Sequence, residues 1–229
     1  MKMNRRIKMK QPNLHRIWVV SILCIISSSS SAHVVVQELE KMSGTDAALV
    51  YLKLGYTHIL PLGMDHILFV LSLFLLSPKL KPLLWQATAF TIAHSVTLGL
   101  AMYQVIRPPA GLVEPLIALS ILYVSLENIF SPRLKASRIG VVFLFGLIHG
   151  MGFAGALGQL GLPPHAFLLS LILFNAGVEM GQITVILVAW FLFAKWYGDK
   201  PWYRNRLVIP ASVLIAFIAA FWTIQRIVL

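Results

Sequence analysis

Acidic and histidine side chains occur inside long apolar segments of this chain. Asp65 and His66 are adjacent in one segment, and His94, His149 and Glu179 each lie in another. A charged side chain at mid-bilayer costs about 2.5–3.5 kcal/mol, so a functional reason is expected. These segments contain no Lys or Arg, so we expect no ion pairs to the acids. Imidazole with carboxylate favours a divalent transition metal (nickel, cobalt, zinc or copper) over magnesium or calcium; a proton or a neutral hydrogen-bonded network is the alternative.

The segment around Asp65 carries a predicted break in its helix. Pro61 lacks a backbone donor and Gly63 relaxes the chain, so a regular helix is interrupted there. Irregular backbone at membrane depth is tolerated against protein or a watery cavity. We therefore expect His58 to fold back over Asp65 and His66 as a further ligand. The alternative is that His58 lies at the membrane surface while Asp65 caps the helix.

Two later segments share a short motif, Phe-x-x-x-His followed by a small residue, at 90–95 and 145–150. A segment with a carboxylate follows each of them, supplied by Glu127 and Glu179. This order indicates a parallel internal repeat of two helical hairpins, with chance similarity as the alternative.

Helical spacing groups further polar residues. Asn175, Glu179 and Gln182 follow the i, i+4, i+7 pattern of one helix face. Small residues let membrane helices approach closely, so the glycines of these segments are expected to bring His149 to the Asn175–Glu179 face. The alternative is that glycines and amides serve packing only, with Glu179 protonated and hydrogen-bonded. Ser120, Tyr123 and Glu127 share a face of another helix, with Glu127 nearer the inner surface. The supporting polar residues are Asn175, Gln182, Glu127, Asn128 and Ser95.

Composition places the chain among membrane proteins. Of its 229 residues, 58% are hydrophobic and 12% charged, whereas a soluble domain is about one quarter charged. The net charge of +11 does not indicate nucleic acid, because six of the 19 Lys and Arg residues precede Trp18 and most others lie between apolar runs. We predict an all-α, polytopic transmembrane bundle of about six spans. The expected spans are 55–76, 83–106, 112–130, 139–160, 166–194 and 207–228.

The first 32 residues are typical of a signal peptide, with a basic stretch, a short apolar core and small residues up to Ala32. Cleavage there leaves His33 as the N-terminus and an additional candidate metal ligand; a retained anchor helix is the alternative. A short periplasmic segment (33–54) then precedes the membrane domain (55–229). Nine basic residues in alternate loops place those loops inside and both mature termini outside a bacterial inner membrane.

At these residues the chain resembles the HupE/UreJ family of membrane proteins, which are associated with hydrogenase and urease and regarded as nickel permeases. The matching elements are the histidine after the signal peptide, Gly-Met-Asp65-His66, Ala-His94-Ser, Gly-Leu-Ile-His149-Gly and Phe-Asn175-Ala-Gly-Val-Glu179. The resemblance implies that Asp65 and His66 form the nickel motif with His58 as its preceding histidine, and that metalloenzyme maturation proteins are partners. In the better-known members the first histidine is followed by proline, whereas here His58 is followed by Ile59. This difference indicates a divergent branch of the family.

The leading hypothesis is a permease or binding protein for a divalent transition-metal ion. The expected metal-handling residues are His58, Asp65, His66, His94, His149 and Glu179. An intramembrane metal-dependent enzyme is the alternative from another class, although the chain lacks His-Glu-x-x-His. A haem or metal accessory protein for a periplasmic partner is the third, although Cys-x-x-Cys-His is absent.

Overall fold

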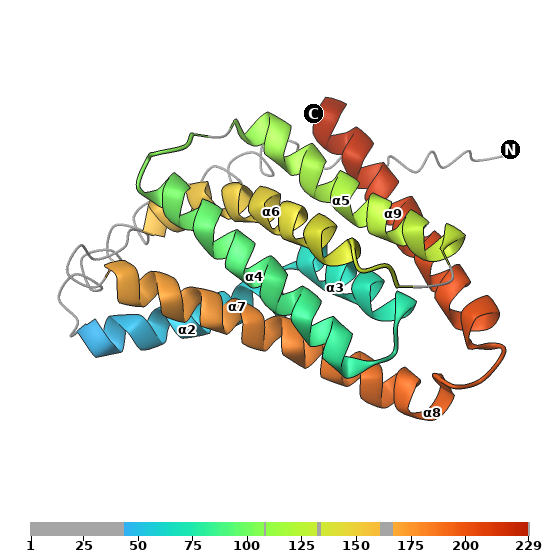
Figure 1. The fold of residues 1–229 in the computed structure, drawn as a ribbon. Helices are drawn as coiled ribbons and strands as arrows, with labels where there is room; N and C mark the ends of the chain where they lie inside the picture. Colours follow the sequence, from blue (N-terminus) through green and yellow to red (C-terminus); the bar gives the residue numbers. More distant parts are fainter. Residues whose placement is uncertain (1–43, 108, 132–133, 161–166, 229) are drawn as a thin grey trace, which may run out of the picture. The chain divides into compact units, whose positions relative to one another are not determined.

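The structure, a computed structural model, describes residues 44–107, 109–131, 134–160 and 167–228, which belong to one unit of the chain. Within them every regular element is a helix, which confirms the predicted all-α class (Figure 1). The predicted signal peptide and His33 lie outside the described residues.

The helices follow one another through short connections. The main ones are α2 (Gly44–Ile59), α3 (Met64–Leu76), α4 (Leu80–Met102), α5 (Ala110–Phe130), α6 (Arg138–Leu160), α7 (Phe167–Ala189) and α9 (Ile209–Val228). A π-helical turn, η2 (Trp190–Ala194), extends α7 into the short α8 (Lys195–Tyr197). A second π-helical turn, η3 (Arg204–Val208), leads into α9.

The predicted break in the first span is confirmed. α2 ends at Ile59, α3 begins at Met64, and the two helices are bent by 67° relative to each other. Gly63 fits the break because a Cβ atom there would collide with the carbonyl oxygen of His58. The residues between the helices therefore turn tightly and set the end of α2 beside the start of α3.

Among the described residues, four helices are long and apolar enough to cross a membrane, and the bent α2–α3 pair makes a fifth if it counts as one span. The four are Ala110–Phe130, Arg138–Gly155, Phe167–Tyr197 and Arg204–Val228. α4 has the length but carries more polar residues, among them Gln86, Thr91 and His94, and it does not qualify. Length and composition thus support a multi-span protein but leave the sixth span a prediction.

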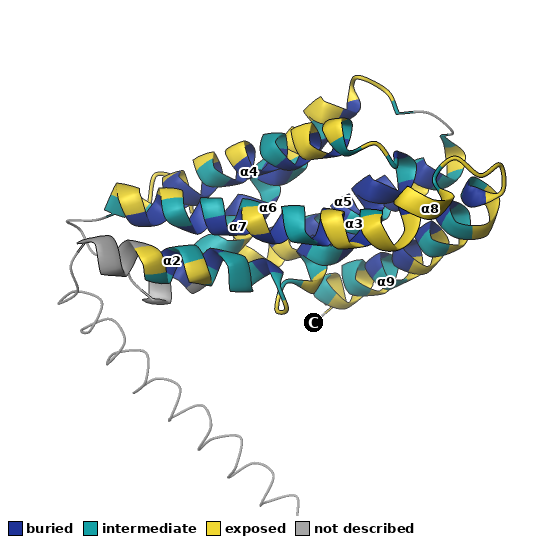
Figure 2. Cartoon of the chain, turned by 90° about the horizontal axis from the view of Figure 1, so that it is seen from below, coloured by how far each residue is buried: buried dark blue, intermediate teal, exposed yellow. Residues whose placement is uncertain are grey.

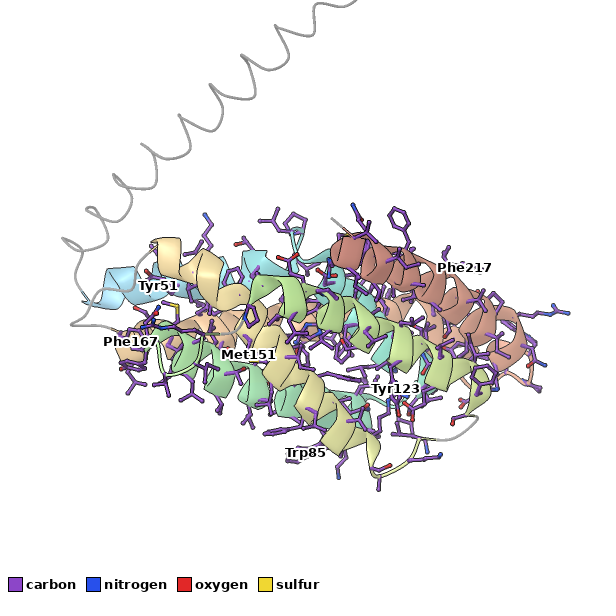
Figure 3. All side chains as sticks on the ribbon, turned by 90° about the horizontal axis from the view of Figure 1, so that it is seen from above. Tyr51, Trp85, Tyr123, Met151, Phe167 and Phe217 are labelled. Carbon is purple, nitrogen blue, oxygen red and sulfur yellow. The ribbon has the colours of Figure 1, made fainter. Side chains whose placement is uncertain are left out.

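The outer faces of the helices are apolar, as contact with lipid requires. On α9, Leu214, Phe217, Phe221 and Ile224 form an exposed stripe at helical spacing, and exposed residues follow the outward surfaces of other helices (Figure 2). Phe217 and Trp85 project from the protein at 72% and 61% exposure (Figure 3). Soluble proteins rarely expose apolar surface of this extent to water. The protein is therefore a membrane protein.

Glycines permit close approach in two of the three main helix pairs. α4 packs along α6, α2 along α7, and α5 along α9 (Figure 1). On α6, Gly150 lies against the backbone of His94, and on α7, Gly177 lies against the backbone of α2. The expectation that glycines bring His149 to the Asn175–Glu179 face is therefore wrong. The glycines of α7 face α2, and it is α4, not α6, that meets Asn175.

Candidate functional site

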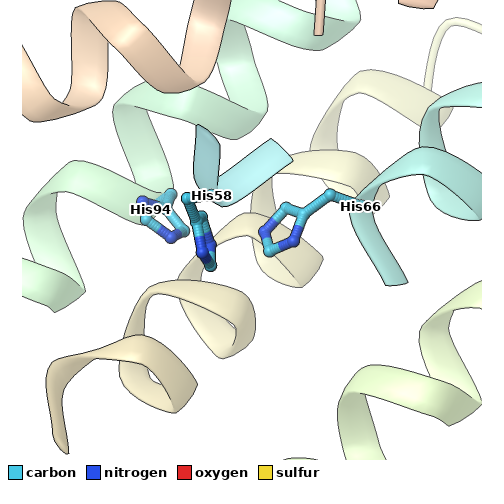
Figure 4. A group of neighbouring side chains, drawn as sticks. All are labelled: His58, His66 and His94. Atoms are coloured by element: carbon cyan, nitrogen blue, oxygen red, sulfur yellow. The ribbon is translucent and has the colours of Figure 1, made fainter. Parts of the chain in front are cut away.

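Three histidines from three helices converge in the interior. His58 comes from the end of α2, His66 from the start of α3 and His94 from the middle of α4 (Figure 4). One ligand nitrogen of each lies within 4.8 Å of the others. The rings of His58 and His66 are 4.6 Å apart between centroids, so His58 does fold back across the break as expected.

The orientation of His94 is determined by its neighbour on α7. The Asn175 amide nitrogen donates to the Leu171 carbonyl at 2.8 Å, which turns its oxygen toward His94 Nδ1 at 3.1 Å. Because that oxygen only accepts, Nδ1 must carry the proton and donate. The lone pair of a neutral His94 ring is then on Nε2, the geometry in which an outer-shell partner prepares a histidine for a metal.

Each ring of this triad has a buried nitrogen without a protein partner. Within the described part of the chain, Nε2 of His58, His66 and His94 is buried and makes no hydrogen bond. Buried polar atoms are nearly always hydrogen-bonded, and an unmade bond costs about 1–3 kcal/mol. A cation accepting three nitrogen lone pairs would satisfy all three atoms together, so the cluster fits a transition metal.

His149, from α6, adjoins this triad without joining it. Its ring is 5.1 Å from that of His66 between centroids. The Ser120 hydroxyl donates to the Ile117 carbonyl at 2.7 Å, so it accepts from His149 Nε2 at 3.0 Å. The lone pair of a neutral His149 is consequently on Nδ1, which is buried and has no partner among the described residues.

Asp65 lies at a cavity of about 490 Å³ that His58, His66 and His149 also line. The expectation that no cation pairs with this acid is wrong. Both carboxylate oxygens accept from Arg226 Nη2 at 3.0 Å, and Arg226 belongs to α9, 161 residues away. The helix-cap alternative is not supported, since the N-cap of α3 is Gly63 and no side chain caps it.

Glu179 does not reach the histidines. Its carboxylate accepts from the Thr88 hydroxyl at 2.6 Å and lines a groove between α4 and α7 that Ser95 and Asn175 share. Gln182 accepts from Thr91 at 3.4 Å. The predicted common face of Asn175, Glu179 and Gln182 is confirmed, because all three contact α4. A metal-handling role for Glu179 stays a prediction.

Glu127 and Asn128 belong to a separate polar network around Arg138. This arginine is 1% exposed and donates to Glu127 at 3.0 Å and to Asn128 at 3.3 Å. It also donates to Gln86 at 3.1 Å. The expectation that Glu127 has no ion pair is therefore also wrong. The sequence places Arg138 in a basic loop, but Arg138 is the first residue of α6 and is buried inside the bundle.

Two arginines are thus the site residues that sequence reasoning missed. Arg226 is the only charged residue in the otherwise apolar α9, and this isolation is the signal that could have identified it. Arg138 carries no such signal, since it resembles the other loop cations. Both illustrate that acids inside membrane proteins pair with residues of other helices.

These features define a helical membrane protein with a buried histidine cluster beside an acidic cavity. The chain belongs to the HupE/UreJ family: the family model described as HupE / UreJ protein matches residues 31–226. No curated protein and no solved structure matches the chain.

Proposed function

We propose that the protein is a permease or binding protein for a divalent transition-metal ion that, like nickel, binds imidazole and carboxylate ligands. The observation that carries the proposal is the convergence of three imidazoles, from His58, His66 and His94. One nitrogen of each ring lies within 4.8 Å of the others, and Nε2 of each is buried without a hydrogen-bond partner. Membership of the HupE/UreJ family supports it, because the family is regarded as nickel permeases. The ion is the cargo of the protein.

The ligand chemistry suits an ion that enters and leaves. Neutral imidazoles bind nickel, cobalt, zinc and copper without the thiolates that would hold them more firmly. In transporters, broken helices commonly form the binding site near mid-membrane. The break between α2 and α3 supplies both His58 and His66, so a change at this break would alter two ligands at once.

A path through the cavity follows from the remaining residues. Asp65 is 29% exposed and adjoins the buried His66, so it would meet the ion before the histidines do. His149 Nδ1 offers a further lone pair on the same cavity. The ion would pass from carboxylate to imidazoles, losing water as it moves inward. His33 would serve as an outer ligand, and metalloenzyme maturation proteins would receive or supply the ion.

The bundle would cross a bacterial inner membrane six times. α4 would be a span in addition to the five that length and composition support. The polar side chains of α4 are hydrogen-bonded within the protein, which removes the objection to placing it in lipid. Thr88, Thr91 and His94 bond residues of α7, and Gln86 accepts from Arg138 of α6. The loop between α5 and α6 would lie inside. After Cys24 is replaced, a cysteine at the exposed Ser137 should resist an impermeant thiol reagent, while one at the exposed Gln104 should react. The reverse labelling would overturn this orientation.

Uptake by proteoliposomes tests the proposal. Purified protein is reconstituted, and entry of nickel, cobalt, zinc and copper is compared with protein-free vesicles. His66→Phe keeps an aromatic ring but removes both nitrogens, so it should abolish uptake and binding. The control is Phe217→Leu, which removes an aromatic ring that is 72% exposed on α9 and lines neither the cavity nor the histidine cluster. Equal activity of His66→Phe and wild type would refute the proposal, and a haem absorption band would favour the accessory role.

A further inference from the structure

The ion pair between Asp65 and Arg226 occupies the carboxylate that an entering metal ion would meet. Arg226 Nη2 lies 3.0 Å from both oxygens of Asp65, and the two side chains are 22% and 29% exposed. The pair therefore lies at the rim of the cavity and not in its depth, where His66 and His149 are buried.

Arg226 is held in place by more than this carboxylate. Its Nη1 donates to the backbone carbonyl of Glu114 on α5 at 3.2 Å, and its guanidinium lies 5.5 Å from the ring centroid of Trp222. These contacts keep the cation at the cavity when Asp65 is engaged elsewhere. A guanidinium with five donors can serve several acceptors from one position.

The charges around the cavity are unequal. Asp65, Glu114 and Arg226 are the acidic and basic residues that line it, so these residues carry one formal negative charge in excess. A divalent ion at Asp65 would be attracted by both acids and repelled by the guanidinium. Glu114 lines the same cavity, and its backbone carbonyl already accepts a hydrogen bond from Arg226.

We propose that Arg226 is a tethered cation that competes with the transported metal for Asp65 and thereby sets the affinity of the site. In the empty site Arg226 neutralises Asp65. An arriving divalent ion displaces the guanidinium toward Glu114, and the return of Arg226 to Asp65 helps to release the ion toward the histidines. This inference rests on the proposed function and adds a residue that determines affinity, although it donates no lone pair to the metal.

The test measures metal affinity of full-length protein in lipid nanodiscs by equilibrium dialysis against nickel and cobalt. Arg226→Gln removes the competing charge, so binding should tighten by roughly tenfold, the factor that about 1.4 kcal/mol produces. Arg226→Lys keeps the charge but loses the second nitrogen, which donates to the Glu114 carbonyl and holds the cation at the cavity, so its affinity should lie between the two. The matched control is Arg206→Gln, which removes an exposed cation at the other end of the same helical run and should not alter affinity.

A double-mutant cycle distinguishes competition from a structural role. In an Asp65→Asn background the carboxylate is neutral, so Arg226→Gln should change affinity little. Unchanged or weaker binding by both Arg226 variants, at a melting temperature equal to that of wild type, would overturn the inference while leaving the proposed function intact. If Arg226→Gln unfolds, Arg226→Lys alone decides, and wild-type affinity in that variant counts against competition. Absence of binding by wild type would refute the proposed function itself.

Discussion

Replacing Asn175 by leucine removes the acceptor of His94 Nδ1 at similar side-chain size. His94 is 0% and Asn175 5% exposed, so water cannot readily take the place of the lost amide oxygen. An unmade buried hydrogen bond costs about 1–3 kcal/mol, and the ring can avoid this only by changing its tautomer or orientation. Either change takes the lone pair from Nε2. Loss of an outer-shell partner typically weakens metal binding by 10–100-fold, and we expect a loss in this range.

The assay is equilibrium dialysis of nickel or cobalt against purified protein. Asn175→Asp keeps an acceptor and adds charge, so binding should be equal to or tighter than that of wild type. Gln182→Met is the matched control, because Gln182 lies on the same face of α7 and bonds Thr91, not a histidine. Wild-type affinity in Asn175→Leu, or an equal loss in Gln182→Met, would refute the argument that Asn175 prepares His94.

Three further predictions concern stability and pH. Gly177→Ala should lower the unfolding free energy by about 1–3 kcal/mol in detergent melts, because its Cβ would collide with the Leu52 carbonyl; Gly140→Ala, which meets no atom within 4 Å, should be neutral or stabilising. Arg138→Met should lower the free energy of unfolding by about 3–5 kcal/mol, because it leaves Glu127 unpaired. Recovery of stability in a Glu127→Gln, Arg138→Met double variant would confirm the cause. Metal binding should weaken at acid pH, because protons compete with the metal for the lone pairs of the ligands; dialysis across pH checks this, and pH-independent binding would contradict it.

Features set by a few neighbouring residues could be predicted from the sequence. Pro61 and Gly63 act on the backbone at their own positions, so the break between α2 and α3 and the return of His58 to His66 followed from local chemistry. Helical periodicity placed Ser120 and Glu127 on one face of α5, and both indeed bond residues of α6.

Contacts between distant helices could not be predicted. Arg226 meets Asp65 only because α9 returns beside the start of α3, and no local pattern encodes that return. The glycines indicated close helix approach but not the partner, since a small surface accepts any helix of matching shape. For the same reason Glu179, which has the right residue type and spacing, lies with Thr88 and not with the histidines.

The most direct test of the histidine cluster is X-ray absorption spectroscopy of purified protein loaded with one equivalent of nickel or cobalt. The account predicts a bound ion whose outer-shell scattering shows several imidazoles, and loss of one imidazole in His94→Phe. An ion surrounded by oxygen alone, or the same imidazole signal in His94→Phe as in wild type, would contradict it.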